Sequence, residues 1–290
     1  MSEALTAMST TALKWKIREL GQRFCPRTTL ALLARRTWVF EPELDLLPYL
    51  CKRRGMAIDA GANKGIYLYR LAKLFKVVAG FEPHPALADY LRRAAPRNVT
   101  IHPIALSDAR RESVLSLPEG FIELGSLEPD IIKSWATDRV VENHPVALAP
   151  LDTFEFDDVA LIKIDVEGHE MALLHGARMT ISRWRPSVLI EVEEQHAAGS
   201  VAAVRHWFEQ HNYAGFFLDG ARLLPIADFN AAFDQDIGNL RQSVKAGRYI
   251  NNFLYFDRDE ADQIVTAINK ALRSGSRLRG LVPRPAPAYR

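Results

Sequence analysis

The stretch Ile58-Asp-Ala-Gly-Ala-Asn-Lys-Gly65 decides the fold, together with Phe81-Glu82-Pro83 further along the chain. An apolar run leads into Asp59 and two glycines, and a helix-like stretch and a second apolar run follow before Glu82. This order predicts a strand, a tight turn, a helix and a second strand that ends in a carboxylate. Such a unit binds nucleosides, because glycines let the backbone approach the ligand and the carboxylate accepts hydrogen bonds from ribose hydroxyls.

The spacing of the glycines indicates which nucleoside fits. A dinucleotide fingerprint has the pattern G-x-G-x-x-G, whereas Gly61 and Gly65 here enclose Asn63 where the middle glycine would stand. Asp59 adds negative charge at the mouth of the site, which disfavours a pyrophosphate and favours a cation. S-adenosyl-L-methionine has an adenosine, no phosphate, an ammonium and a sulfonium, so we expect it as the cofactor. The alternative is an ordinary strand-to-helix turn that binds nothing.

Strand and helix signals alternate from residue 56 onward, which is typical of an α/β fold with a parallel sheet and helices on both faces. Strands are expected at 56–60, 77–82, 99–104, 160–165, 187–193, 213–218 and 250–256, and helices at 64–75, 85–95, 169–183 and 200–211. The aromatic content of the last strand suits an antiparallel strand in a mostly parallel sheet. Two long stretches, 106–150 and 219–248, are expected to be loops over the active site.

The chain is expected to have three parts. Residues 1–50 form an N-terminal helical extension, which covers the cofactor cleft, covers a dimer face or packs on the sheet. Residues 51–258 form the α/β domain. Residues 259–290 form a C-terminal helix and a basic tail with three prolines, which is expected to be extended and solvated. Contact of this tail with an acidic surface is the alternative.

A second group of polar residues belongs to the strands expected at 160–165 and 187–193. Lys163, Asp165 and Glu167 alternate along the chain and therefore point the same way, as Glu191 and Glu193 do. Because open α/β sheets bind ligands beyond the carboxyl ends of their strands, these residues are expected to share a cleft. A carboxylate there takes a proton from a substrate hydroxyl, or holds sugar-like hydroxyls, or pairs with Lys163 for structural reasons. A divalent metal is a further alternative that the spacing alone does not show, and no metal site is expected.

Three further positions lie near the expected cleft. His169 is a candidate base, because the pKa of histidine suits proton transfer near neutral pH, and the alternative is a residue that fills a helix start. Ser107 and Asp108 end the third strand, where Asp108 either accepts from the adenine amino group or forms a turn with Ser107. His84 lies either near the adenosine or in a solvated loop.

The composition restricts the classes of partner and compartment. The chain is 48% hydrophobic and 25% charged with a net charge of +2, which is ordinary for a globular protein and requires no nucleic acid. The two cysteines lack C-x-x-C spacing, so neither a disulfide scaffold nor a cysteine zinc site is expected. Because no long apolar run and no signal peptide is recognisable, we expect no membrane span and a cytoplasmic location.

These motifs resemble the FkbM family of S-adenosylmethionine-dependent methyltransferases. The matching stretches are Asp59-Ala-Gly-Ala-Asn-Lys-Gly65, Phe81-Glu82-Pro83, Ala105-Leu-Ser-Asp108, Leu151-Asp152-Thr153 and Leu161-Ile-Lys-Ile-Asp-Val-Glu-Gly-His-Glu170. Their order and spacing match from about residue 56 to about residue 193, which is about half of the chain, and 251–256 is a weaker echo. The Asp-Val-Glu-Gly turn placed after the glycine turn is the most specific part of the resemblance.

The resemblance implies a Rossmann-like, seven-stranded methyltransferase sheet and O-methylation of a hydroxyl on a sugar, a glycan or a polyketide-like molecule. The implied site residues are Asp59, Gly61 and Asn63 at the methionine end, Glu82 at the ribose, Ser107 and Asp108 at the adenine, and Asp165 and Glu167 at the reaction centre. Lys64 departs from the family, which more often has an apolar residue there. The expected partner is a small-molecule or glycan acceptor, and a homodimer is compatible with the helical extension.

Two other functions stay open at this point. A nicotinamide-dependent oxidoreductase is disfavoured because the middle glycine and a Tyr-x-x-x-Lys signature are both missing. A non-catalytic binding protein that retains a methyltransferase fold is excluded by nothing in the sequence.

Overall fold

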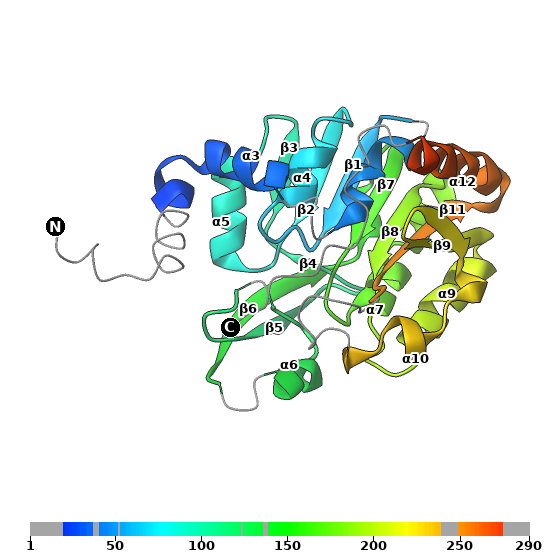
Figure 1. The fold of residues 1–290 in the computed structure, drawn as a ribbon. Coiled ribbons are helices and arrows are strands. Elements are labelled where there is room, and N and C mark those ends of the chain that lie inside the picture. The colour runs from blue at the N-terminus through cyan, green and yellow to red at the C-terminus, as the bar shows by residue number, and fades with distance from the viewer. Residues whose placement is uncertain are drawn as a thin grey trace, which may run out of the picture.

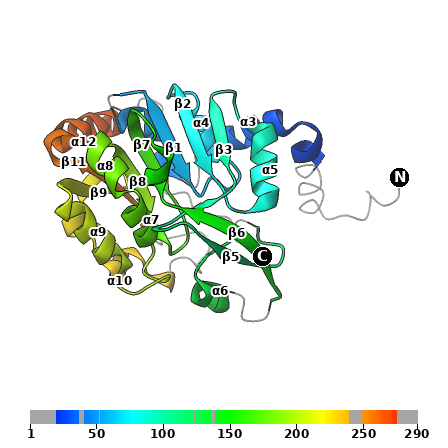
Figure 2. The same ribbon diagram turned by 180° about the vertical axis from the view of Figure 1, so that it is seen from behind.

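The structure is a computed structural model that describes residues 20–36, 41–51, 53–122, 124–135, 139–238 and 249–274 (Figure 1). Within these ranges eight strands form one sheet, the main sheet, in the order β10-β9-β11-β8-β7-β1-β2-β3 (Figures 1 and 2). Its strands are β1 (Met56–Ala60), β2 (Val77–Phe81), β3 (Val99–His102), β7 (Val159–Ile164), β8 (Ser187–Glu191), β9 (Tyr213–Asp219), β10 (Arg222–Pro225) and β11 (Asn252–Asp257). β11 is antiparallel to both β8 and β9, whereas β1 runs parallel to β2 and β7. The expected mostly parallel sheet with an antiparallel last strand is confirmed.

The eighth strand, β10, differs from the expectation of seven strands. It pairs antiparallel with β9, and Asp219 lies opposite Arg222. Gly220 is the first residue of the two-residue connection Gly220–Ala221 and adopts φ +58, which suits a hairpin of this length because its favoured turns need positive φ at that position. The beginning of the stretch expected to be a loop is therefore a hairpin that extends the edge of the sheet. Residues 239–248 of the same stretch lie outside the described residues.

Helices cover both faces of the main sheet, as expected, because each face presents a separate hydrophobic cluster. One face is covered by α3 (Pro26–Arg36), η2 (Pro42–Asp45), η3 (Leu47–Tyr49), α4 (Ile66–Leu71), α5 (Pro85–Ala94) and α12 (Arg258–Arg273). The other face is covered by α7 (Glu170–Gly176), α8 (Arg178–Trp184) and α9 (Ser200–Gln210). The strands next to the centre are buried along their whole length, which explains their continuous apolar sequences.

The described part of the N-terminal extension packs on the sheet. Leu30, Leu44, Leu46, Leu47 and Leu50 are buried in the same cluster as α4 and α12. The helical pattern expected before residue 20 and the tail from 275 to 290 lie outside the described residues. No helix in the described ranges combines the length and the hydrophobicity needed to cross a bilayer.

The helix expected at 169–183 is two helices, α7 and α8, with Ala177 between them. A side chain at Gly176, the last residue of α7, would place its Cβ 1.9 Å from the carbonyl oxygen of Ser107. The end of α7 thus lies directly against Ser107, which follows β4 (Ala105–Leu106) and does not end the third strand as expected, because β3 ends at His102. Ser107 also contacts His169 at the start of the same helix.

The described residues between 105 and 149 form a second sheet with a short helix, where residues 106–150 were expected to be a loop. In this described segment, β4 (Ala105–Leu106), β6 (Val141–Ala149) and β5 (Arg111–Pro118) make three strands in that order, and α6 (Pro129–Trp135) connects β5 to β6. We call this unit the insertion sheet, and Figures 1 and 2 show it, with α6, beyond one end of the main sheet. Leu115 and Leu117 on β5 and Val146 and Leu148 on β6 are buried and alternate with more exposed residues. This alternation is typical of a sheet with one solvated face. Polar residues and Pro145 lie in the same strands and obscure the pattern in the sequence.

Candidate active site

The glycine turn after β1 is tied to both neighbouring strands. Gly61 and Asn63 adopt left-handed backbone conformations with φ +81 and +47, and the amides of Gly61 and Ala62 each donate 3.0 Å hydrogen bonds to the carbonyl of Phe81. A Cβ on Gly61 would lie 1.7 Å from the carbonyl oxygen of Asp165. Only glycine therefore fits at position 61, because the turns that follow β1 and β7 touch there through their backbones.

Glu82, directly after β2, is held from both sides. Its Oε2 accepts a 2.7 Å hydrogen bond from the amide of Asn63, and its Oε1 accepts a 2.8 Å bond from the amide of His84. Burial raises the pKa of this carboxyl to about 7, although the hydrogen bonds from the two backbone amides lower it. Each oxygen can accept a further hydrogen bond, so Glu82 presents two fixed acceptors to a ligand.

A buried lysine connects the two turns. Asp59 lies beside Lys163 in the β1–β7 register, and Nζ of Lys163 makes a 3.0 Å ion pair with Oδ2 of Asp165. Burial lowers the pKa of Lys163, but the carboxylates of Asp165, Glu191 and Asp59 outweigh burial and keep the amine charged. Burial raises the pKa of Asp59 to about 7, and within the described chain its Oδ2 has no hydrogen-bond partner.

The turn between β7 and α7 reverses the chain sharply, and we call residues 165–170 the β7 turn. Glu167 has φ +46 and Gly168 has φ +93, so two consecutive residues occupy left-handed conformations. Oε1 of Glu170 accepts a 2.8 Å hydrogen bond from the amide of Gly168. Burial raises the pKa of the Glu170 carboxyl to about 7. Glu170 therefore closes the turn rather than facing a ligand.

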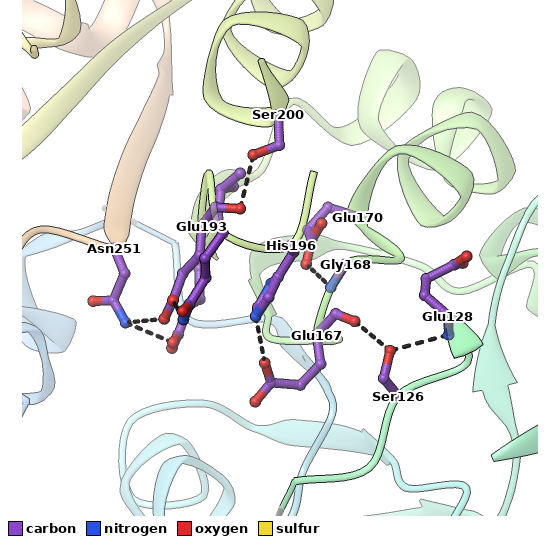
Figure 3. Close-up of polar contacts among 12 residues, drawn as sticks. Ser126, Glu128, Glu167, Gly168, Glu170, Glu193, His196, Ser200 and Asn251 are labelled. Atoms are coloured by element: carbon purple, nitrogen blue, oxygen red, sulfur yellow. Dashed lines mark hydrogen bonds and ion pairs between the residues drawn. The ribbon is translucent and has the colours of Figure 1, made fainter. Parts of the chain in front are cut away.

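Carboxylates from two strand ends gather beside the β7 turn (Figure 3). Asn251 donates from Nδ2 to Glu191 at 2.6 Å and to Glu193 at 3.1 Å, and His196 Nε2 lies 3.4 Å from Oε2 of Glu167. Burial raises the pKa of Glu167 well above its usual range, and the nearby carboxylates of Asp165 and Glu193 raise it further. The pKa of Glu191 is raised for the same reasons, first by burial and then by Asp165. These acids lie close together, but of Asp165, Glu167, Glu191 and Glu193 only the first two line the cleft described below.

His169 is almost fully buried and uses both ring nitrogens. Nε2 lies 2.9 Å from Oγ of Ser107, and Nδ1 lies 2.8 Å from Oε1 of Glu128. Ser107 is completely buried, whereas Asp108 is half exposed and makes a 2.6 Å ion pair with Arg111. The hydrogen bonds from Arg111 and Ser107 lower the pKa of the Asp108 carboxyl.

One cleft joins most of the sequence-predicted site residues. Among them, its lining includes Gly61, Asn63, Glu82, Asp165, Glu167 and His169. The other predicted site residues do not line it, namely Asp59, Gly65, Ser107 and Asp108. His84 also lines the cleft and is buried, so it does not lie in a solvated loop. The opposite wall comes from the insertion sheet and its loops, through Leu115, Ile122, Gly125 and Leu127.

Sequence reasoning missed four residues that contact the predicted ones. They are Ser126, Glu128, His196 and Asn251. Ser126 and Glu128 belong to a stretch with no periodic pattern, and only the folded insertion sheet brings them to the β7 turn. Asn251 does have a signal in the sequence, because it is a polar residue near the start of the last expected strand, just before a run of aromatic residues.

A family model described as "Methyltransferase FkbM domain" matches residues 59–214, and no curated protein matches the sequence. The crystal structure of methyltransferase FkbM from Methylobacillus flagellatus KT is similar at 17% identity and TM-score 0.45, covering 70% of this chain and 44% of that chain. This chain thus spans less than half the length of that protein.

Two other methyltransferase structures are similar at lower identity. The O-methyltransferase from Bacillus cereus in complex with SAH has 11% identity and TM-score 0.40, with 83% of this chain and 96% of that chain covered. A SAM-dependent methyltransferase from Aquifex aeolicus has 12% identity and TM-score 0.38, with 80% of this chain and 98% of that chain covered.

Proposed function

This chain belongs to the FkbM methyltransferase family, whose model matches more than half of it, and we propose that it methylates a hydroxyl of a sugar, glycan or polyketide-like acceptor. The family resemblance seen in the sequence is thereby confirmed. The family indicates a methyltransferase, and we infer that its cofactor is S-adenosyl-L-methionine. The hydroxyl acceptor and the role of each residue are our proposals.

The cleft suits this cofactor better than a dinucleotide. Among the described residues that line it, none is lysine or arginine, so nothing there neutralises a pyrophosphate. The open acceptors are acidic, namely Glu82 in the lining and the unpartnered oxygen of buried Asp59 behind it. We assign the ribose to Glu82 and the methionine end to the turn Gly61–Gly65, with Asp59 beneath it. Leu106 lines the cleft where the chain turns into Ser107 and Asp108, so we place the adenine against Leu106.

Glu167 is the group we assign as general base. When bound, S-adenosyl-L-methionine supplies an electrophilic methyl on a sulfonium, so the protein needs chiefly to orient the hydroxyl and accept its proton. Glu167 lines the cleft, and its raised pKa makes its carboxylate a stronger base than an exposed glutamate. Asp165, held in an ion pair with Lys163, is assigned to orient the acceptor hydroxyl.

The sequence also made His169 a candidate base, and the geometry favours another role. Both of its ring nitrogens are engaged, with Ser107 and Glu128, and neither is left to take a proton from a substrate. We therefore assign His169 to hold the start of α7 in place.

The observation that carries the proposal is the placement of Glu82 and Glu167 on one cleft. The first supplies fixed acceptors for a nucleoside, and the second supplies a carboxylate of high proton affinity at the other side. O-methylation needs such a pair, because an alcohol must lose its proton as the new bond forms.

The test is methyl transfer from S-adenosyl-L-methionine carrying a radiolabelled methyl onto a panel of sugars, glycan extracts and polyketide alcohols. We expect a labelled methyl ether from wild type, and roughly a hundredfold slower transfer by Glu167→Gln. Exposed Glu119 provides the matched control, and Glu119→Gln should react as wild type does. Label on nitrogen or carbon would contradict the hydroxyl acceptor. A protein that binds the cofactor but labels no member of the panel would favour the non-catalytic alternative.

A further inference from the structure

Ser126 joins the insertion sheet to the β7 turn through a single hydroxyl. Its Oγ donates a 2.6 Å hydrogen bond to the carbonyl oxygen of Glu167 and accepts a 3.0 Å bond from the amide of Glu128 (Figure 3). Ser126 is 1% exposed, so this hydroxyl has no access to water as a substitute partner. Loss of this hydrogen bond would therefore cost more free energy than loss of a hydrogen bond made by an exposed serine.

The backbone of Ser126 is fixed independently of that hydroxyl. Ser126 and Ser116 exchange two backbone hydrogen bonds of 3.0 Å each, which anchor Ser126 to β5. The hydroxyl of Ser116 instead donates to Asn143 on the neighbouring strand β6, away from the β7 turn. Two serines that are paired with one another thus direct their hydroxyls to different places.

Glu167 needs such an anchor because its backbone conformation is unfavourable. A left-handed conformation costs a residue other than glycine about 1 kcal/mol, and Glu167 has φ +46. The next residue is confined as well, since a Cβ on Gly168 would lie 2.2 Å from Cδ1 of Ile131 on α6. The insertion sheet and α6 therefore hold the reversed turn from outside.

A second connection runs parallel to the first. Glu128, whose amide bonds to Ser126, also reaches Nδ1 of His169 with its carboxylate at 2.8 Å. His169 continues the chain of hydrogen bonds to Ser107 at 2.9 Å. The hydroxyl of Ser126 lies at the branch point of this network, where one bond reaches Glu167 and the other leads to His169.

We propose that Ser126 is a positioning residue, whose hydroxyl holds the peptide plane of Glu167 so that the carboxylate stays in the cleft; this rests on the proposed role of Glu167. Fixing the carbonyl fixes the direction of the Cα–Cβ bond, and hence where the side chain points. The titratable groups that face Glu167 come from three places. They are Asp165, Lys163 and Glu170 near the β7 turn, Glu191, Glu193 and His196 at and after the end of β8, and Tyr249 before β11. Without the Ser126 bond, the turn relaxes and the carboxylate moves out of this group toward solvent.

The pKa of Glu167 reports this position directly and requires no acceptor. We propose to measure it by carbon NMR on protein labelled at Cδ of glutamate, with the Glu167 resonance identified by its loss in Glu167→Gln. In Ser126→Ala the pKa of Glu167 should fall by about 1 unit or more, because the carboxyl gains water and leaves its acidic neighbours. Ser126→Cys has a slightly larger side chain that retains only a weak donor, and it should give a smaller fall in the same direction.

The matched control is Ser116→Ala, which removes an equal hydroxyl from the paired serine. It should leave the pKa of Glu167 within about 0.2 units of the wild-type value, well below the spread seen among folded proteins. S-adenosylhomocysteine binding, measured by calorimetry, should stay within about twofold of wild type in all three variants, because the Glu82 side of the cleft is unchanged.

An unchanged Glu167 pKa in both Ser126 variants would overturn the proposal, as would an equal shift in Ser116→Ala. If Ser126→Ala fails to fold, the Ser126→Cys measurement decides alone. Failure of wild type to bind S-adenosylhomocysteine would instead contradict the proposed function, and the comparison of pKa values would still decide the role of Ser126.

Discussion

The backbone amide of Asn63 donates a 2.7 Å hydrogen bond to Oε2 of Glu82, which ties the glycine turn to the end of β2. Replacement of Glu82 by alanine removes the acceptor of this amide, the acceptor of the His84 amide and the group assigned to the ribose. We expect Glu82→Ala to weaken the binding of S-adenosyl-L-methionine by roughly tenfold to a hundredfold, as measured by calorimetry. The exposed Glu119, changed to alanine, should leave the affinity unaltered. Equal affinity of wild type and Glu82→Ala would rule out the ribose assignment.

A pair of glycines with the same backbone conformation tests the contact between the two turns. Gly61 and Gly120 have φ +81 and +82, but a Cβ would lie 1.7 Å from a carbonyl oxygen at Gly61 and would meet nothing within 4 Å at Gly120. Gly120→Ala should cost about 1 kcal/mol of unfolding free energy, which is the cost of the left-handed conformation alone. Gly61→Ala should cost at least about 3 kcal/mol more, because the backbone must move. Urea unfolding of both variants measures the difference, and similar losses would show that the close approach is unimportant.

Lys163 carries a buried charge that several carboxylates share. Lys163→Met removes the 3.0 Å ion pair with Asp165 and leaves that carboxylate and Asp59 without a nearby cation. We expect a loss of about 3–5 kcal/mol in unfolding free energy at neutral pH. The double variant Lys163→Met/Asp165→Asn should recover part of this loss, because one of the uncompensated charges is gone. A double variant as unstable as the sum of both single changes would contradict the pairing.

Glu43 offers a test of burial outside the proposed site. Burial raises its pKa from 4.5 to about 7, so the folded state binds a proton that the unfolded state releases. The resulting stabilisation is complete below about pH 4.5 and disappears as the pH rises to about 7. Glu43→Gln keeps a neutral side chain at every pH. Its stability relative to wild type should therefore increase by up to about 3 kcal/mol between pH 5 and pH 8.

Urea unfolding of both proteins at the two pH values measures this difference. A relative stability that is the same at pH 5 and pH 8 would show that Glu43 titrates normally.

Local patterns were sufficient to predict seven of the eight strands described in the main sheet. The glycine turn, the acid after β2 and the apolar runs 56–60 and 160–165 each act through neighbouring residues, and a parallel strand buried on both faces reads as continuous apolar sequence. The first six expected strands and the antiparallel last strand were placed by such signals. Gly220 was an equally local signal for a tight turn. The short edge strand after it, β10, was missed because residues 219–248 were expected to be a loop.

The insertion sheet was beyond local reasoning. Its strands β5 and β6 are separated by more than twenty residues that include α6, so their pairing is a long-range contact. The contacts of Ser126, Glu128 and His169 depend on that pairing, so local sequence could not show that both ring nitrogens of His169 are hydrogen-bonded. The raised pKa of Glu167 likewise depends on burial against groups from β8 and cannot be read from the Asp-Val-Glu-Gly motif.

The most direct test of the account is a crystal structure of this protein grown with S-adenosylhomocysteine. We predict that the nucleoside lies in the cleft between the glycine turn and the insertion sheet, with its ribose hydroxyls about 2.6–3.0 Å from the Glu82 oxygens. Glu167 should face the sulfur side of the ligand. A nucleoside bound elsewhere, or bound in the cleft with its ribose away from Glu82, would contradict the central claim.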